Sequence, residues 1–123
     1  MRNISFMLTT PQVRGRTKTV TRRSGWRSLK AGDLLCAVEK SQGLGKGGKV
    51  VRIGVIRVVN VRRELLRAMY DDTNYGREEC RREGFGEHPQ LFDPVEFVNW
   101  FCASHRGCTP ETEITRIEFE YAQ

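Results

Sequence analysis

Alternation of apolar and polar positions predicts a first half built from strands and a second half richer in helices. The pattern indicates strands or extended segments over residues 3–9, 17–21, 33–39, 49–61 and 117–121. Within 49–61, five β-branched residues share one parity: Val51, Ile53, Val55, Val59 and Val61. Gly54 interrupts this run, so we expect a bend or bulge there, as small barrels need.

Helical patterns follow this strand. Residues 64–70 and 76–82 have helical composition, and Thr10 with Pro11 predicts a short helical turn earlier in the chain. A longer helix is expected after Asp93, with Pro94 in its first turn, Glu96 as capping partner and Gly107 as its end. The early strands lack crossover helices, which argues against a parallel α/β sheet. We therefore predict an α+β fold, a small mixed β-barrel with helices inserted before the last strand.

The glycine-rich segment 41–48 separates two predicted strands and is interpreted as a hairpin loop. Its G-x-G spacing does not indicate a dinucleotide site, because the segment precedes a strand and opens no helix.

The length of 123 residues suits one domain spanning 1–123. No apolar run approaches the roughly 20 residues that cross a bilayer, and no signal-peptide pattern opens the chain. We expect a cytoplasmic protein without a membrane partner or a cofactor.

Charge is distributed unevenly. Residues 1–63 hold 15 Lys and Arg against two acids, a formal charge of +13, whereas residues 64–123 hold six against 13, a charge of −7. This asymmetry suggests that the first half meets a polyanion, with nucleic acid as the leading candidate.

The four cysteines are Cys36, Cys80, Cys102 and Cys108. Cys102, His105 and Cys108 form a C-x-x-H-x-x-C pattern that offers three metal ligands, but tetrahedral zinc sites usually have tighter ligand pairs. Cys102 also falls on the apolar face of a predicted helix, where a free thiol is commonly a small core residue. We predict reduced thiols, no structural metal and no obligatory disulfide.

The densest polar segment runs from Arg14 to Arg23 and is followed by Trp26. It resembles the signature of the ASCH domain, a PUA-like β-barrel family linked to RNA, and is most similar to short ASCH proteins of phages and prophages. Lys18, Thr21 and Arg23 fall on the lysine, threonine and arginine of that signature, while Arg16 stands where the signature has glycine. Three further segments match: residues 29–33, 83–85 and 114–121.

The residue types of the basic segment are also those of a site that binds phosphate and a nucleobase. Arg16, Arg22 and Arg23 offer forked donors to phosphate oxygens. Trp26 either provides a face on which an unstacked base rests or packs against the core. We therefore predict binding of single-stranded or modified RNA in a basic cleft.

The resemblance implies a catalytic alternative at the same place. In some ASCH proteins a lysine, a threonine and a glutamate hydrolyse N4-acetylcytidine, and the matching residues here are Lys18, Thr21 and Glu83. Ribonuclease activity is also associated with the family. A third class, a phage protein that inhibits a host protein, would leave little trace in a sequence. A hydrogen bond from Lys18 to the Thr21 hydroxyl would favour the enzyme over the binding module.

Overall fold

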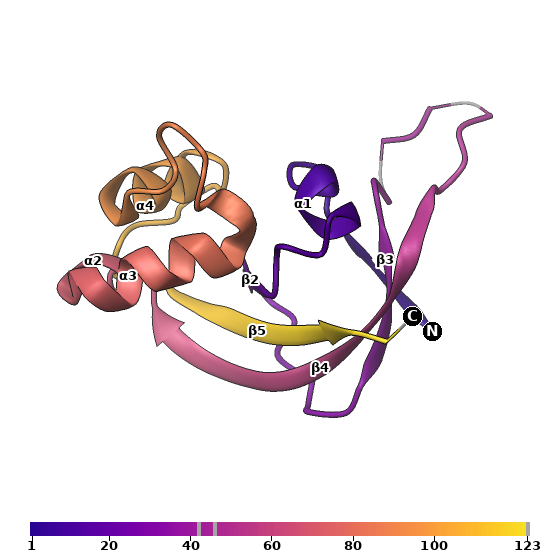
Figure 1. The fold of residues 1–123 in the computed structure, drawn as a ribbon, viewed down its shortest axis with the longest axis horizontal. Coiled ribbons are helices and arrows are strands. Elements are labelled where there is room, and N and C mark those ends of the chain that lie inside the picture. Colours follow the sequence, from indigo (N-terminus) through magenta and orange to yellow (C-terminus); the bar gives the residue numbers. More distant parts are fainter. Residues whose placement is uncertain (42, 46, 123) are drawn as a thin grey trace.

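A curled five-stranded mixed sheet forms the body of the protein (Figure 1). The computed structural model describes residues 1–41, 43–45 and 47–122. The strands are β1 (Arg2–Ser5), β2 (Val20–Arg23), β3 (Leu34–Val38), β4 (Arg52–Leu65) and β5 (Glu113–Tyr121). They lie in the order β1-β3-β4-β5-β2, and the sheet bends into a half-barrel. The expected barrel-like α+β architecture is thus confirmed.

Irregular pairing along β4 explains the bend. The register between β3 and β4 shifts after Ala37, which pairs with Gly54, and the register between β4 and β5 shifts around Val59. Extra residues in one strand of a pair increase its local twist. The bulge expected at Gly54 is found next to it, and the second one turns Val59 outward. The single parity predicted for the valines of β4 is therefore wrong, because the alternation resets at each bulge.

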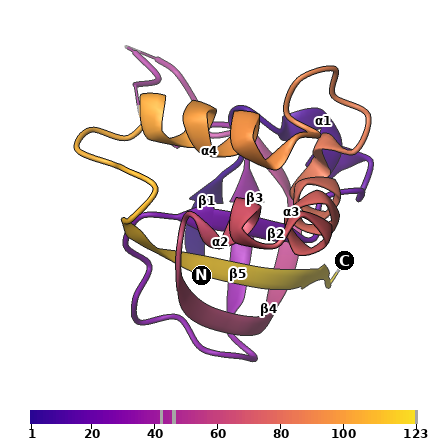
Figure 2. The ribbon, with the colours of Figure 1, turned by 90° about the vertical axis from the view of Figure 1, so that its left-hand side faces the viewer.

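The helices lie between β4 and β5 in the chain, apart from α1 (Thr10–Arg14), which follows β1. They comprise α2 (Ala68–Asp71), α3 (Thr73–Cys80), the π-helical turn η1 (Arg81–Phe85) and α4 (Pro94–Ala103). Helices α2 to α4 gather above one end of β4 and β5, and α1 lies above the middle of the molecule. In the view turned by 90°, α4 runs across the top with β5 below it (Figure 2).

Two predicted helix limits are wrong. Glu64 and Leu65 belong to β4, because they pair with Ile114 and Glu113 of β5, and this long-range pairing overrides their helical propensity. Helix α4 begins as expected, with the Asp93 carboxylate accepting from the Glu96 amide at 3.2 Å. It ends at Ala103, before Gly107, since the Ser104 hydroxyl donates to main-chain oxygens of the last turn.

Two hydrophobic clusters hold the layers together. The first fills the half-barrel around Ile4, Phe6 and Phe119, and the second lies under the helices around Met69, Phe97 and Ile114. Gln42 and Lys46 of the predicted glycine-rich loop lie outside the described residues. Within the part of the chain that is described, no helix is both long and apolar enough to cross a membrane.

Candidate functional site

Lys18 and Glu83, 65 residues apart, meet in the interior between the two clusters. The Lys18 ammonium donates to the Glu83 carboxylate and to the Glu83 main-chain oxygen, each at 2.8 Å. Both residues are buried, with exposures of 2% and 3%. Burial lowers the pKa of Lys18, and the neighbouring Glu83 carboxylate opposes that shift. The structure thus brings together Lys18 of the matched signature and Glu83 of a further matching segment.

Arg22 is the centre of a larger buried ion network. Its guanidinium donates to Glu83 at 3.1 Å, to Glu79 at 2.6 Å and to Glu64 at 2.9 Å. Although burial disfavours its charge, these three carboxylates raise the pKa of Arg22. Glu79 also accepts from Arg116 of β5. The network ties β2 and β5 to α3 and η1, so Arg22 serves the fold and its charge is satisfied internally.

Gly84 places Glu83 at this position. It has a φ of 97° inside η1, a conformation that L side chains rarely adopt. A Cβ atom there would lie 2.8 Å from Cβ and Cγ of Gln12 and 3.4 Å from Cβ of Lys18. Gly84 thus marks a kink within η1. The glycine therefore allows η1 to approach α1 closely enough for Glu83 to reach Lys18.

A cavity of about 350 Å³ lies beside this network, and we call it the aromatic pocket. Its polar lining includes Thr21, Arg22, Arg23 and Glu83, four of the seven site residues predicted from sequence. Its aromatic lining comprises Phe6, Phe97, Trp100, Phe101 and His105. Lys18 is not among the lining residues. Small-molecule sites are roughly 300–1,000 Å³, mostly apolar and equipped with a few fixed polar groups, so this pocket has the size and composition of a ligand site.

Arg23 is the pocket cation whose hydrogen-bond partners are neutral. Its guanidinium donates to the Thr21 hydroxyl at 3.0 Å and to the Ser5 carbonyl at 2.7 Å, and it lies 5.0 Å from the centre of the Phe6 ring. Among the described residues, no carboxylate lies within 4.0 Å of it. Burial lowers the pKa of Arg23 to about 10, which leaves the group charged at neutral pH. Arg23 is half-buried, its direct partners are neutral, and the Glu83 carboxylate acts on it only from a greater distance, so it can bind an anionic or strongly accepting ligand.

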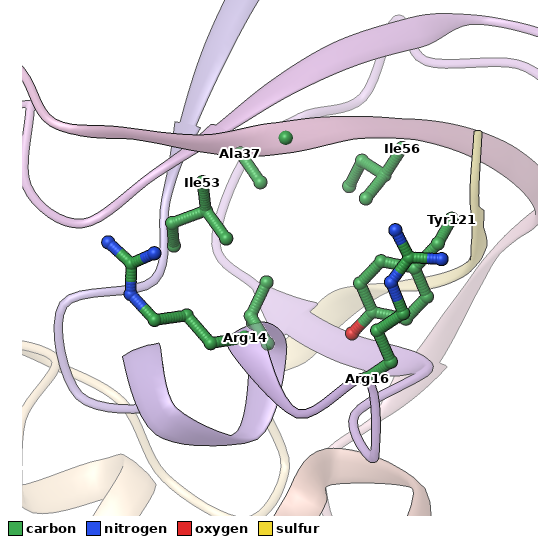
Figure 3. Close-up of a pocket in the computed structure, with 8 residues that line it drawn as sticks. Arg14, Arg16, Ala37, Ile53, Ile56 and Tyr121 are labelled. Atoms are coloured by element: carbon green, nitrogen blue, oxygen red, sulfur yellow. The ribbon is translucent and has the colours of Figure 1, made fainter. Parts of the chain in front are cut away.

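Arg16 and Trp26 lie outside the aromatic pocket. Arg16 is exposed and lines a second, smaller cavity next to Tyr121 (Figure 3). Trp26 packs against the half-barrel core, and the Arg2 guanidinium lies 3.9 Å from the centre of its ring. One face of the Trp26 ring is thus already covered. The sequence prediction grouped these residues by proximity in the chain, whereas the fold separates them.

Sequence reasoning missed Glu79 and the aromatic wall from α4. Glu79 and Glu83 are four residues apart, a spacing that places both on one face of a helix. Two acids on the same face of a predicted helix could have indicated ion-pair partners for Lys18 and Arg22. Trp100 carried no such signal, because its apolar character fits a core position equally well.

The C-x-x-H-x-x-C residues lie beside the pocket without forming a metal cluster. The Cys102 and Cys108 sulfurs are 3.5 Å apart. The His105 Nδ1 lies 2.8 Å from the Phe101 carbonyl oxygen, and its ring stacks on that of Phe101 at 4.0 Å. Within the described residues, no three His, Cys, Asp or Glu side chains are grouped to hold a metal ion. His105 is instead part of the pocket wall.

Comparison with known proteins bears on the fold. No family model and no curated protein matches the chain. Among solved structures, the fold is similar to the crystal structure of protein EF3133 from Enterococcus faecalis V583, a DUF984 protein. The two share 16% sequence identity and a TM-score of 0.53, over 91% of this chain and 68% of that chain. Similarity at this level is a similarity of the half-barrel fold, and a shared fold does not determine function.

Proposed function

We propose that the protein binds single-stranded or modified RNA by taking one nucleotide into the aromatic pocket. The observation that carries the proposal is the combination of aromatic walls with the Arg23 cation, whose direct hydrogen-bond partners are neutral. Proteins that recognise unpaired bases stack them on aromatic rings and bind their edges and phosphates with polar groups. The pocket offers Trp100, whose side chain is partly exposed, for stacking and Arg23 and Thr21 for hydrogen bonding.

The resemblance to ASCH proteins supports the same proposal. Three residues of the matched signature meet at this site: Thr21 and Arg23 line the aromatic pocket, and Lys18 holds Glu83 beside it. The family is linked to RNA and has a PUA-like barrel, which agrees with the curled half-barrel sheet. We also propose that the chain belongs to the ASCH family.

Binding is best measured by fluorescence, because Trp100 lines the pocket and Trp26 does not. The chain has two tryptophans, so Trp26→Phe leaves Trp100 as the reporter. Titration with cytidine monophosphate is expected to quench its emission. Arg23→Gln should weaken this binding about tenfold or more, since a charge-assisted hydrogen bond contributes about 1.5–3 kcal/mol.

Arg27→Gln is the matched control, because it removes the same charge from an exposed residue of the same segment. It should change the affinity less than twofold. Equal effects of the two substitutions, or no binding of cytidine monophosphate or a short RNA at low salt, would refute the proposal.

Hydrolysis of N4-acetylcytidine is a second candidate, favoured by the lowered pKa of the buried Lys18 beside Glu83. In this reaction the Thr21 oxygen attacks the acetyl carbonyl carbon while its proton passes to the Lys18 amine. The C–N bond then breaks, cytidine leaves with a proton on N4, and water hydrolyses the acetyl-threonine to acetate. In the described structure Lys18 bonds to Glu83, and no hydrogen bond joins it to the Thr21 hydroxyl. This arrangement favours binding over hydrolysis.

Incubation with N4-acetylcytidine and chromatography of the products separates the two candidates. If the protein is a hydrolase, cytidine accumulates and Lys18→Met abolishes it, whereas Arg27→Gln does not. We expect N4-acetylcytidine to bind without turnover. Turnover that depends on Lys18 would replace the binding proposal by the enzyme.

A further inference from the structure

A second cavity, of about 130 Å³, lies between α1 and the strands β3 and β4. It is smaller than the roughly 300–1,000 Å³ of a complete small-molecule site, so it has room for only part of a ligand, such as one base. Figure 3 shows Arg14 at one side and Arg16 at the other, with Ala37, Ile53 and Ile56 between them. We call it the arginine-flanked pocket. Its lining comprises Val13, Arg14, Arg16, Ala37, Ile53, Gly54, Ile56 and Tyr121.

The backbone of Arg16 is strained in a way that places its side chain at this pocket. Its φ is 60°, and among the described residues only Trp26 shares a positive φ without being glycine. Glycine would adopt this conformation without strain, and glycine is what the resembled signature has there. The guanidinium instead lies 5.2 Å from the centre of the Tyr121 ring. Strained non-glycine residues cluster at functional sites, which suggests that the side chain is used.

Among the described residues, Arg14 forms an exposed ion pair. Its guanidinium pairs with Glu39, and the two side chains are 48% and 37% exposed. Exposed ion pairs contribute little to stability, so Arg14 can exchange the carboxylate for a phosphate of a ligand. Gly54 leaves the pocket lining open, because a Cβ atom there would meet no atom within 4 Å.

One short segment of the chain, built around helix α1, contributes to both pockets. Met7, Leu8 and Thr9, just before the helix, line the aromatic pocket, and Val13, Arg14 and Arg16, at its end, line the arginine-flanked pocket. The two pockets therefore share residues of the segment 7–16.

We propose that the arginine-flanked pocket binds the nucleotide next to the one in the aromatic pocket, on the same RNA strand. The base packs against Ile53 and the Arg16–Tyr121 pair, and the linking phosphate contacts Arg14 and Arg16. Planar guanidinium groups and aromatic rings both support stacked bases, and arginine forks match phosphate oxygens. This inference rests on the proposed function of the aromatic pocket.

The test compares cytidine monophosphate with a cytidine hexanucleotide in the same fluorescence titration. Wild-type protein should bind the hexanucleotide at least tenfold more tightly than the mononucleotide. Gly54→Val places a side chain in the open space of the arginine-flanked pocket, and Arg16→Gly removes the arginine at its other side. Each variant should lose most of the gain in affinity for the hexanucleotide and keep the wild-type affinity for the mononucleotide. Arg14→Gln should flatten the log–log salt dependence of hexanucleotide binding by about 0.7, the contribution of one phosphate contact.

The outcomes distinguish the two proposals. If the mononucleotide binds and Arg23→Gln weakens it, but the hexanucleotide binds no better, the second pocket is refuted and the first stands. If neither ligand binds, the proposed function is refuted. Circular dichroism and thermal unfolding of each variant check that it is folded, so that a loss of hexanucleotide binding reports on the pocket.

Discussion

Glu79→Gln is expected to lower the free energy of unfolding by about 3–5 kcal/mol, the usual cost of removing one partner of a buried ion pair. Glu79 is 2% exposed and accepts hydrogen bonds from Arg22 and Arg116. Its replacement leaves Arg116 buried without its principal counter-ion and deprives Arg22 of one of three carboxylates. Urea unfolding followed by circular dichroism measures the change.

Glu78→Gln is the matched control at the neighbouring position. Glu78 pairs with Arg81 and Arg82 on the surface, and its loss should change stability by less than about 1 kcal/mol. Similar effects of the two substitutions would contradict the assignment of stability to the buried network.

Lowering the pH should remove the stabilisation that the Glu79 carboxylate gives to the fold. Burial opposes its charge, but Arg116 and Arg22 lower its pKa to about 2, from an ordinary value of 4.5. A group whose folded-state pKa is depressed stabilises the fold fully above its unfolded value and loses that contribution as the pH falls to the folded one. The stability difference between wild type and Glu79→Gln should therefore shrink between pH 4.5 and pH 2. A difference that stays constant over this interval would show that the charge of Glu79 is not responsible.

Gly76→Ala should destabilise the protein by about 3 kcal/mol, against the usual trend for a helix. In an exposed helix interior this change gains about 1 kcal/mol. Here a Cβ atom would overlap the carbonyl oxygen of Met69 and lie 2.8 Å from Cγ of Pro94, so α3 would have to move away from α2 and α4. The backbone clash outweighs the gain in helical propensity. Thermal and urea unfolding measure the loss.

Gly54→Ala makes the same chemical change with the opposite expected sign. Its added Cβ atom meets no atom within 4 Å, and alanine is favoured over glycine within a strand by roughly 0.5–1 kcal/mol. The variant should be slightly more stable than the wild type. If Gly54→Ala destabilised the protein as Gly76→Ala does, β4 would need a glycine for its bulge. That result would contradict the predicted opposite signs of the two substitutions.

The local patterns of the sequence were sufficient to predict most elements, whereas the meeting of Lys18 with Glu83 was expected from the resemblance to ASCH proteins. The Asp93 cap and the alternation in β5 depend on neighbouring residues, which a sequence shows directly. The limit between β4 and α2 depends on pairing with β5, some 50 residues away, and local propensity therefore gave the wrong element at Glu64. The same holds for Trp26, whose neighbours in space come from β1.

The charge asymmetry had a partly internal cause. Within the part of the chain that the structure describes, several cations of the first half pair with carboxylates of the second half, among them Lys18, Arg22, Arg57, Arg62 and Arg63. Much of the contrast between the two halves therefore reflects ion pairs that join them across the fold. Counting charges along a chain cannot separate such pairs from a surface that faces a polyanion, because the count holds no information on partners. Arg23, which has neutral partners, is the cation of the basic segment for which the argument for a ligand is strongest.

The position of β2 beside β5 has a consequence for synthesis of the chain. Val20 pairs with Glu118 and Arg23 with Thr115, so β2 lacks its partner until nearly the whole domain has left the ribosome. Contacts between such distant segments form slowly, because a long loop must close first. Until then Thr21, Arg22 and Arg23 have no strand to hold them, and the aromatic pocket does not exist. During translation the nascent chain thus exposes a basic, unpaired segment, and any affinity it has for RNA at that stage is electrostatic and lacks the selectivity of the folded site.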